Sequence, residues 1–432
     1  MRTEMLLARV RRYRPGRLAI NTLLSSFWQA IRVASQALWV VIIARQLGPN
    51  SYGAFSGIAG LAVTLGGFTG LGLGLVMHQE VSRHAVNFGS YWHNALRLVL
   101  ISGIVFTGVF ALVAPYMMEW HLSVLAIMAI GAAELLCFPV VTLCAFAFAA
   151  HERSGWSAAI PVLMACARLV AGLCFWRLIE HHILENYVWF HFGASVVAAY
   201  ICLVVTTSIL RPTPLRIPIR WRDIREGFGF STVWATGIAL SSLDKSLVLR
   251  SSGGTTAGLY TAVYRFTSVL AQPMDALVSA AMPRLFRKGA GDATHPRLLA
   301  HLALAIFGYA VLAGMILWAA ADLLPILLGR AFAPAVSATR WMALFLPCYG
   351  LRMLGTNVLM ASGCKKLRVL VEGFGLLTLF FFAIRWLPAY GLYGAVIMII
   401  ATEASLATLA WSAVYIAHRK PLLFHDPTKP HP

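Results

Sequence analysis

The chain has 432 residues, of which 59% are hydrophobic and only 12% are charged, and its mean hydropathy is +0.75. Such an apolar composition excludes a soluble globular protein of any fold. The sequence therefore predicts an all-α polytopic membrane protein, and the net charge of +19 has to be explained within that class.

Long apolar segments follow one another along the chain and are separated by short breaks with turn-forming or charged residues. A bilayer core of about 30 Å requires roughly 20 apolar residues per helical span. On this basis we predict twelve spans, six before and six after a basic segment at 211–225. They cover residues 18–46, 52–77, 94–116, 122–148, 155–176, 187–209, 226–249, 257–282, 298–320, 335–361, 367–386 and 391–417.

Lys and Arg are distributed unevenly among the segments between spans. If the N-terminus is cytoplasmic, the segments on the cytoplasmic side hold 24 of the 35 basic residues, as the positive-inside rule requires. We therefore predict that both termini are cytoplasmic. The basic segments would contact anionic headgroups, and no nucleic-acid partner is predicted. The first span is too long for the apolar region of a signal peptide and contains Arg32, so no cleavage is expected.

A short motif occurs twice in the chain. The segments IARQLGPNSYGAF and VLRSSGGTTAGLY align at an offset of 205 residues, which pairs Gly48 with Gly253 and Gly53 with Gly258. Each half has six predicted spans and so starts on the same side of the membrane, which makes the repeat a parallel one. The predicted organisation is a basic N-terminus (1–17), a six-helix lobe (18–210), an interfacial linker (211–225), a second six-helix lobe (226–417) and a tail (418–432), with the transport path between the lobes.

Gly66, Gly70 and Gly74 stand four residues apart in the second predicted span. In a continuous helix they would share one face and let a neighbouring helix approach closely. We interpret them as packing residues, since a phosphate-binding loop would need a Lys-Ser/Thr ending and a flanking strand. The seven cysteines and thirteen histidines lack metal-ligand spacing. Neither a metal site nor catalytic residues are predicted.

Eleven ionisable residues lie within the predicted spans, where each costs on the order of 3 kcal/mol on insertion scales. Such residues normally face a cavity or one another. Six of the eleven are basic, which favours an anionic substrate such as a phosphate or diphosphate, because Arg binds these groups with paired hydrogen bonds. The candidates for substrate binding are Arg32, Lys245, Arg265 and Arg352, and those for gating or ion coupling are Asp244, Glu134, Asp275, Glu372 and Glu403.

Four of these candidates carry specific expectations. Arg32 is the leading candidate for gripping the anion, because it lies in the middle of the first span. Asp244 and Arg265 are expected to form an ion pair, since they are equidistant from a turn whose midpoint falls between Gly254 and Thr255 and would lie at the same depth on antiparallel helices. Lys245 would then be free to point into the cavity.

Three segments resemble a known family: LGPNSYGAF after the first span, DKSLVLRSSGGTTAGLYTAVYRFTSVLAQPMDALVSAAMPRLFR in the second half, and NVLMASGCKKLRV after span 10. They are similar to the polysaccharide-transporter or O-antigen flippase branch of the multidrug/oligosaccharidyl-lipid/polysaccharide (MOP) superfamily. The likeness covers essentially the whole chain.

The resemblance implies a V-shaped bundle of two lobes. It would move an undecaprenyl-diphosphate-linked oligosaccharide across the bacterial inner membrane by alternating access, for the synthesis of O-antigen, capsule or exopolysaccharide. The resemblance implies no cofactor and no catalytic residue; a proton or sodium gradient or the membrane potential would drive the cycle. The implied partners are the lipid-linked glycan, membrane lipids and the polysaccharide polymerase machinery.

Other classes fit the residues less well. A drug or cation antiporter of the same superfamily would be expected to have an acid-rich cavity, and the four acidic candidates Glu134, Asp275, Glu372 and Glu403 keep this alternative open. A major facilitator would carry an acidic-basic signature between spans 2 and 3, which HQEVSRHAVNFGS does not match. A glycan polymerase or ligase would need a large outer loop, and no predicted outer loop exceeds about twenty residues.

Overall fold

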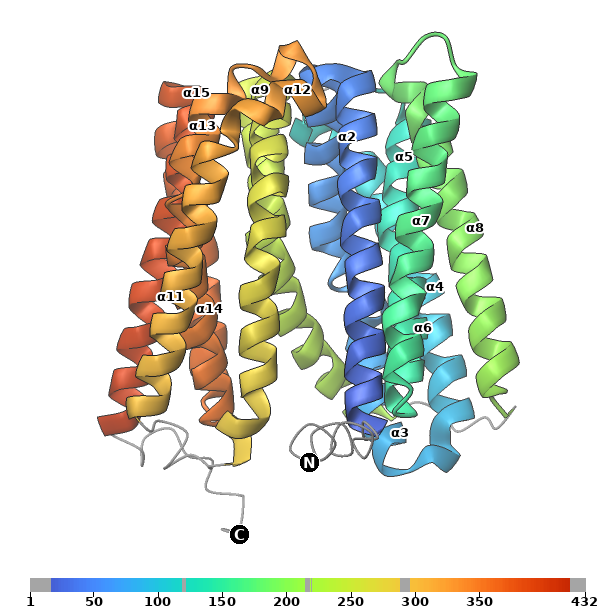
Figure 1. Ribbon diagram of the computed structural model, residues 1–432. Helices are drawn as coiled ribbons and strands as arrows, with labels where there is room; N and C mark the ends of the chain where they lie inside the picture. Colours follow the sequence, from blue (N-terminus) through green and yellow to red (C-terminus); the bar gives the residue numbers. More distant parts are fainter. Residues whose placement is uncertain (1–16, 119–121, 214–217, 219, 288–295, 420–432) are drawn as a thin grey trace, which may run out of the picture.

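The computed structural model describes residues 17–118, 122–213, 218, 220–287 and 296–419. Every regular element in these ranges is a helix, which agrees with the predicted all-α class. Figure 1 shows the long helices side by side in two groups. One group contains α2 (Arg17–Gly66), α7 (Ser154–Leu178) and α8 (Leu184–Leu210), and the other contains α11 (Pro296–Ala319), α14 (Phe345–Ala361) and α15 (Lys365–Arg419).

Seven of the described helices are long and apolar enough to cross a membrane, or eight if the bent pair α13 (Ala335–Met342) and α14 is one span. The chain is therefore a multi-pass membrane protein. Several predicted spans coincide with single helices to within a few residues. For example, α4 (Phe88–Met118), α7, α8 and α11 correspond to the predicted spans 94–116, 155–176, 187–209 and 298–320.

The segments outside the spans are only partly described. The predicted N-terminal segment and tail lie outside the described residues except for their residues nearest the helices, and so do 214–217 and 219 of the predicted linker. Helix α9 (Trp221–Arg287) begins five residues before the predicted start at residue 226. The last part of the predicted linker is therefore helical.

Three long helices fold back on themselves at a glycine. The backbone leaves the helical conformation at Gly48 in α2 (φ 68°, ψ 172°), at Gly253 in α9 (φ 79°, ψ 173°) and at Gly391 in α15 (φ 51°, ψ −119°). The conformation at Gly48 and Gly253 is accessible essentially to glycine alone, because a Cβ would collide with the flanking backbone. Glycine is therefore required at these turns.

The glycine turn divides each of α2 and α9 into two helical arms, one before and one after the turn. Contacts between the two arms confirm that each helix is a hairpin. The rings of Trp39 and Phe55, sixteen residues apart in α2, have centroids 6.2 Å apart. The Tyr260 hydroxyl in α9 donates to the Asp244 carboxylate at 2.6 Å, whereas sixteen residues of straight helix would span about 24 Å. These two pairs are related by the same offset of 205 residues as the repeated motif.

The two repeated turns also pack against each other. We call the end of the bundle that contains these turns, at Gly48 and Gly253, the corner end. A Cβ on Gly53 would lie 2.9 Å from the Gly258 Cα, and a Cβ on Gly258 would lie 2.7 Å from the Pro49 carbonyl carbon. The obstacle is backbone in both cases, so glycine is needed on each side. The two copies of the motif therefore pack against each other and form one contact between the two halves of the chain.

The second predicted span is not a continuous helix. Helix α2 ends at Gly66, a 3-10 turn η1 (Thr69–Gly72) follows, and α3 (Leu73–Arg83) then begins. Gly70, Leu71 and Gly72 have positive φ angles of 74°, 44° and 70°, and the Gly70 amide donates to Ser102 Oγ at 2.8 Å instead of extending the helix. The prediction that Gly66, Gly70 and Gly74 share one helix face is therefore wrong.

Candidate functional site: a charged cavity between the two halves

A cavity of about 400 Å³ lies between the two halves of the chain. The first half contributes α2, α7, α8, the π-helical turn η3 (Ala133–Cys137) and α6 (Phe138–Ala150), and the second half contributes α9 and α14. Basic residues outnumber acidic residues in the cavity lining. Its charged lining residues are Arg32, Arg168, Lys245, Arg265, Glu134 and Asp275.

Glu134, Arg168 and His191 form a buried cluster on the wall of the first half. Glu134 lies in η3, and its Oε1 is 2.9 Å from the Arg168 guanidinium and 3.1 Å from His191 Nε2. Arg168 Nε also donates to Ser195 Oγ at 3.2 Å. Glu134 therefore neutralises Arg168. His191 was not predictable as a site residue from the sequence, because one histidine in an apolar span gives no indication of its partner.

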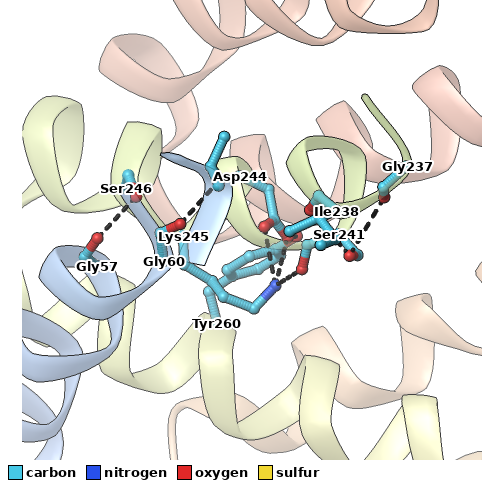
Figure 2. Close-up of polar contacts among 10 residues, drawn as sticks. Gly57, Gly60, Gly237, Ile238, Ser241, Asp244, Lys245, Ser246 and Tyr260 are labelled. Carbon is cyan, nitrogen blue, oxygen red and sulfur yellow. Dashed lines mark hydrogen bonds and ion pairs between the residues drawn. The ribbon is translucent and has the colours of Figure 1, made fainter. Parts of the chain in front are cut away.

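Asp244 forms its ion pair with the next residue, Lys245. The Lys245 amine lies 2.8 Å from Asp244 Oδ1 and donates to the Ser241 carbonyl at 2.7 Å, and Tyr260 donates to the other carboxylate oxygen at 2.6 Å. Figure 2 shows Lys245, Tyr260 and Ser241 gathered around Asp244. The predicted pair between Asp244 and Arg265 is therefore wrong, and Lys245 is not free.

The misplaced turn explains the error. The chain turns at Gly253, so Asp244 is nine residues before the turn, Tyr260 seven after it and Arg265 twelve after it. Arg265 thus lies about 4.5 Å deeper than a residue nine positions after the turn would lie. It also points in a different direction from Tyr260, since five helical residues correspond to a rotation of about 140°.

The pair between Asp244 and Lys245 leads to a stability prediction. Both side chains are buried, so Asp244→Asn should leave a buried ammonium without its counter-ion and destabilise the protein by about 3 to 5 kcal/mol. The double variant Asp244→Asn with Lys245→Met should recover most of this loss. The measurement is thermal unfolding of the purified protein in detergent. Asp322→Asn is the matched control, because its pair with Arg340 is exposed and contributes about 0 to 1 kcal/mol. A double variant less stable than Asp244→Asn would contradict the prediction.

Among the described residues, Arg32 and Arg265 are the two cavity cations without an acidic partner. Both line the cavity, from α2 and from α9, and neither forms an ion pair with any carboxylate in the described part of the chain. Arg32 Nε is buried and has no hydrogen-bond partner, and Arg265 is exposed to the cavity near the Tyr52 hydroxyl. Two guanidinium groups are therefore available to an anion.

Asp275 is an acidic residue that lines the same cavity. It lines the cavity, and its Oδ1 accepts a hydrogen bond from the Tyr349 hydroxyl at 3.0 Å. No basic side chain forms an ion pair with Asp275 among the described residues. A carboxylate with only a hydroxyl partner is available to a cation or a proton.

The remaining candidates form ion pairs outside the cavity lining. Arg352 is hydrogen-bonded to Glu403, and its guanidinium lies 5.0 Å from the centre of the Tyr349 ring. Glu372 accepts a hydrogen bond from Arg368 at 2.9 Å. Arg352, Glu372 and Glu403 are not among the residues that line the cavity. Their roles in substrate binding or ion coupling stay predictions.

Solved structures with the same architecture are transporters. An inward-facing multidrug resistance MATE family transporter of the MOP superfamily matches with a TM-score of 0.72 and 14% identity, covering 92% of this chain and 99% of that chain. An outward-facing multidrug resistance MATE family transporter of the MOP superfamily matches with a TM-score of 0.59 and 17% identity, covering 93% of this chain and 95% of that chain. At this level of identity the likeness establishes the fold alone.

A third similar structure matches over nearly the whole chain. It is a MOP superfamily transporter from Pyrococcus furiosus, described as having a binding pocket of reverse polarity that suggests a different function. It matches with a TM-score of 0.56 and 16% identity, covering 93% of this chain and 94% of that chain.

Comparisons of sequence identify the family. No curated protein sequence matches the chain significantly. Residues 18–288 match the family model described as polysaccharide biosynthesis protein, which is more than half of the chain. Together with the fold, this match confirms the family resemblance that three segments of the sequence indicated. The chain therefore belongs to the polysaccharide biosynthesis protein family, and its fold is that of a MOP superfamily transporter.

Proposed function

We propose that this protein translocates an oligosaccharide linked through a diphosphate to a polyisoprenoid lipid, of the undecaprenyl type, across the bacterial inner membrane. The observation that carries the proposal is the pair of cavity cations, Arg32 and Arg265, which have no acidic partner among the described residues. The polysaccharide biosynthesis family supports a glycan as the cargo.

The energetics of the two arginines favour an anionic substrate. Each guanidinium within a membrane-spanning segment costs on the order of 3 kcal/mol unless it is solvated or paired. A diphosphate offers several anionic oxygens, and a guanidinium binds such oxygens with two parallel hydrogen bonds. Because the two residues come from different halves, an anion held by both would join the halves.

We further propose an alternating-access cycle in which this structure represents the inward-facing state. The backbone contact between Gly53 and Gly258 holds the halves together at the corner end, and the greater likeness to the inward-facing transporter supports the same assignment. The corner end would then face the periplasm, and the opposite end would face the cytoplasm.

The orientation of the twelve proposed spans is testable by labelling. Cysteines introduced at Arg211 and Gly363 should react with an impermeant reagent only after the cells are opened, while one at Thr255 should react in intact spheroplasts. Substitution is preferable to a tag at 253–256, because Gly254 packs against Gly53. Labelling of all three positions from the same side would overturn the proposed topology.

Reconstitution tests the function directly. Purified protein in vesicles should increase the rate at which a fluorescent diphosphate-linked oligosaccharide lipid becomes accessible to a quencher on the opposite side. In cells, deletion of the gene should cause loss of surface polysaccharide and accumulation of the lipid-linked precursor on the inner leaflet. We propose no cofactor, coupling to an ion gradient or the membrane potential, and membrane lipids and the glycan polymerase machinery as partners.

A cation-coupled antiporter of drugs or small molecules is the second candidate function. Asp275 favours it, because this carboxylate lines the cavity with only a tyrosine hydroxyl as its partner. The two functions differ in the effect of charge removal. Antiport of cationic dyes should depend on Asp275 and tolerate Arg32→Ala, whereas translocation of a diphosphate lipid should show the reverse dependence.

A further inference from the structure

A second pocket adjoins the central cavity beside the broken helix. The two share Val63 and Phe138 as lining residues. The second pocket has a volume of about 60 Å³, so it can hold only a short segment of a ligand. It lies between the end of α2, η1, α3, α4 and α6 on one side and the first arm of α9 on the other.

The lining of this pocket excludes a charged group. None of its lining residues is ionisable, and an anion there would be desolvated without a counter-ion. Hydrocarbon is the suitable occupant, since most of the lining side chains are apolar. They are Val63, Leu75, Val99, Phe138, Pro139, Leu143, Phe146, Trp234 and Ile238.

Two hydroxyl groups in the pocket lack partners. Thr69 and Ser231 are only 9% and 1% exposed, and both line the pocket. Within the described part of the chain, neither Thr69 Oγ1 nor Ser231 Oγ has a hydrogen-bond partner. Buried hydroxyls are normally paired, because an unpaired one loses its hydration without compensation. The pocket therefore suits a hydrocarbon segment that begins at an oxygen atom able to accept a hydrogen bond.

The broken helix builds this site. The three successive residues with positive φ, from Gly70 to Gly72, interrupt the span between α2 and α3. Irregular backbone at membrane depth is tolerated where it is buried in protein or lines a cavity. The 3-10 turn at this interruption contributes Thr69 and Gly72 to the pocket lining, and α9 contributes Ser231.

We propose that this pocket binds the first isoprenoid unit of the lipid carrier, the hydrocarbon attached directly to the diphosphate. The ester oxygen between them would accept a hydrogen bond from Thr69 or Ser231, while Arg32 and Arg265 bind the diphosphate in the adjoining cavity. This inference rests on the proposed function and specifies its ligand: the protein recognises the junction between lipid and diphosphate as well as the diphosphate.

The test compares two water-soluble ligands that differ by five carbons. Binding of inorganic pyrophosphate and of dimethylallyl diphosphate to the purified protein is measured by titration calorimetry. Dimethylallyl diphosphate should bind the unsubstituted protein about tenfold more tightly or better, because its chain leaves water for an apolar pocket. Ser231→Met, which places a flexible apolar chain in the pocket, should abolish this difference without changing the affinity for pyrophosphate.

Two further variants make the result specific. Thr232→Met is the matched control, because the Thr232 hydroxyl donates to the Phe228 carbonyl of its own helix at 2.9 Å and Thr232 does not line the pocket; it should keep the tenfold difference. Thr142→Leu fills the pocket from α6 at a partly exposed position, and it replaces Ser231→Met if that variant does not fold.

The outcomes that overturn the inference are distinct from failure of the proposed function. Equal affinities for the two ligands in the unsubstituted protein would overturn the inference. The inference would also be overturned if Ala37→Met abolished the difference in affinity between the two ligands while Ser231→Met preserved it. Ala37 lines a separate pocket between α2 and the second arm of α9. Absence of pyrophosphate binding to the unsubstituted protein would instead contradict the proposed function.

Discussion

Replacement of Arg32 by Ala is expected to reduce translocation of the diphosphate-linked substrate by about 10- to 100-fold, since hydrogen bonds to charged groups contribute about 1.5 to 3 kcal/mol. The side chain lines the cavity without an acidic partner, so its removal takes away an anion-binding group without stranding a buried carboxylate. The variant should therefore reach the membrane at normal levels. The measurement is the initial rate of translocation in vesicles, normalised to inserted protein.

The variant Arg32→Lys keeps the positive charge but removes the planar guanidinium group, so it tests whether the shape of that group matters. It should also impair translocation, because an ammonium is a point charge and cannot form the paired hydrogen bonds of a guanidinium. Arg177→Ala is the control: Arg177 lies at the end of α7 beside the Trp176 ring and does not line the cavity, so translocation should stay near normal. Full activity of Arg32→Ala would remove Arg32 from the site. An equal loss in Arg177→Ala would attribute the effect to net charge.

Gly258→Ala is expected to reduce translocation by at least about tenfold, by disfavouring the state that is closed at the corner end. The added Cβ would lie 2.7 Å from the Pro49 carbonyl carbon and 3.0 Å from its Cα. These atoms belong to backbone, so the collision is relieved only if the two corners separate. A ligand or a substitution shifts an equilibrium by its differential effect on the two states, and this substitution affects the closed state alone.

The separation of the corners can be measured with spin labels at Asn50 and Thr255, both exposed. The distance distribution should move to longer values in Gly258→Ala. Gly308→Ala is the control, because a Cβ at Gly308 in α11 meets no atom within 4 Å; it should change neither the distance nor the rate. An unchanged distribution and rate in Gly258→Ala would show that this contact does not close the corner end.

The all-helical class, the positions of several spans and the repeated motif were predictable from the sequence alone, because each depends on local properties. An apolar segment long enough for a bilayer has to be a helix, since only internal hydrogen bonds satisfy the backbone in lipid. Gly48 and Gly253 were recognisable as equivalent because the same backbone conformation requires the same residue. The interior position of Arg32 was predictable for a similar reason, since a charge in the middle of a span needs a cavity or a partner.

The partners of the charged side chains depended on the tertiary structure. Whether Arg265 lies opposite Asp244 depends on the residue at which α9 turns and on the rotation of both arms, and an error of one or two residues in the turn changes the residue that Asp244 faces across the hairpin. The contact of Glu134 with Arg168 and His191 joins three helical segments, and no local spacing encodes it.

The break between α2 and α3 shows the same limit at the level of the backbone. Gly66, Gly70 and Gly74 have the spacing of a helix face, but the Gly70 amide bonds to Ser102 on another helix and the chain leaves the helical conformation there. Local sequence specifies which conformations a residue can adopt at low cost, and glycine permits several. The choice among them is made by contacts with residues distant in the chain, and those contacts exist only in the folded bundle.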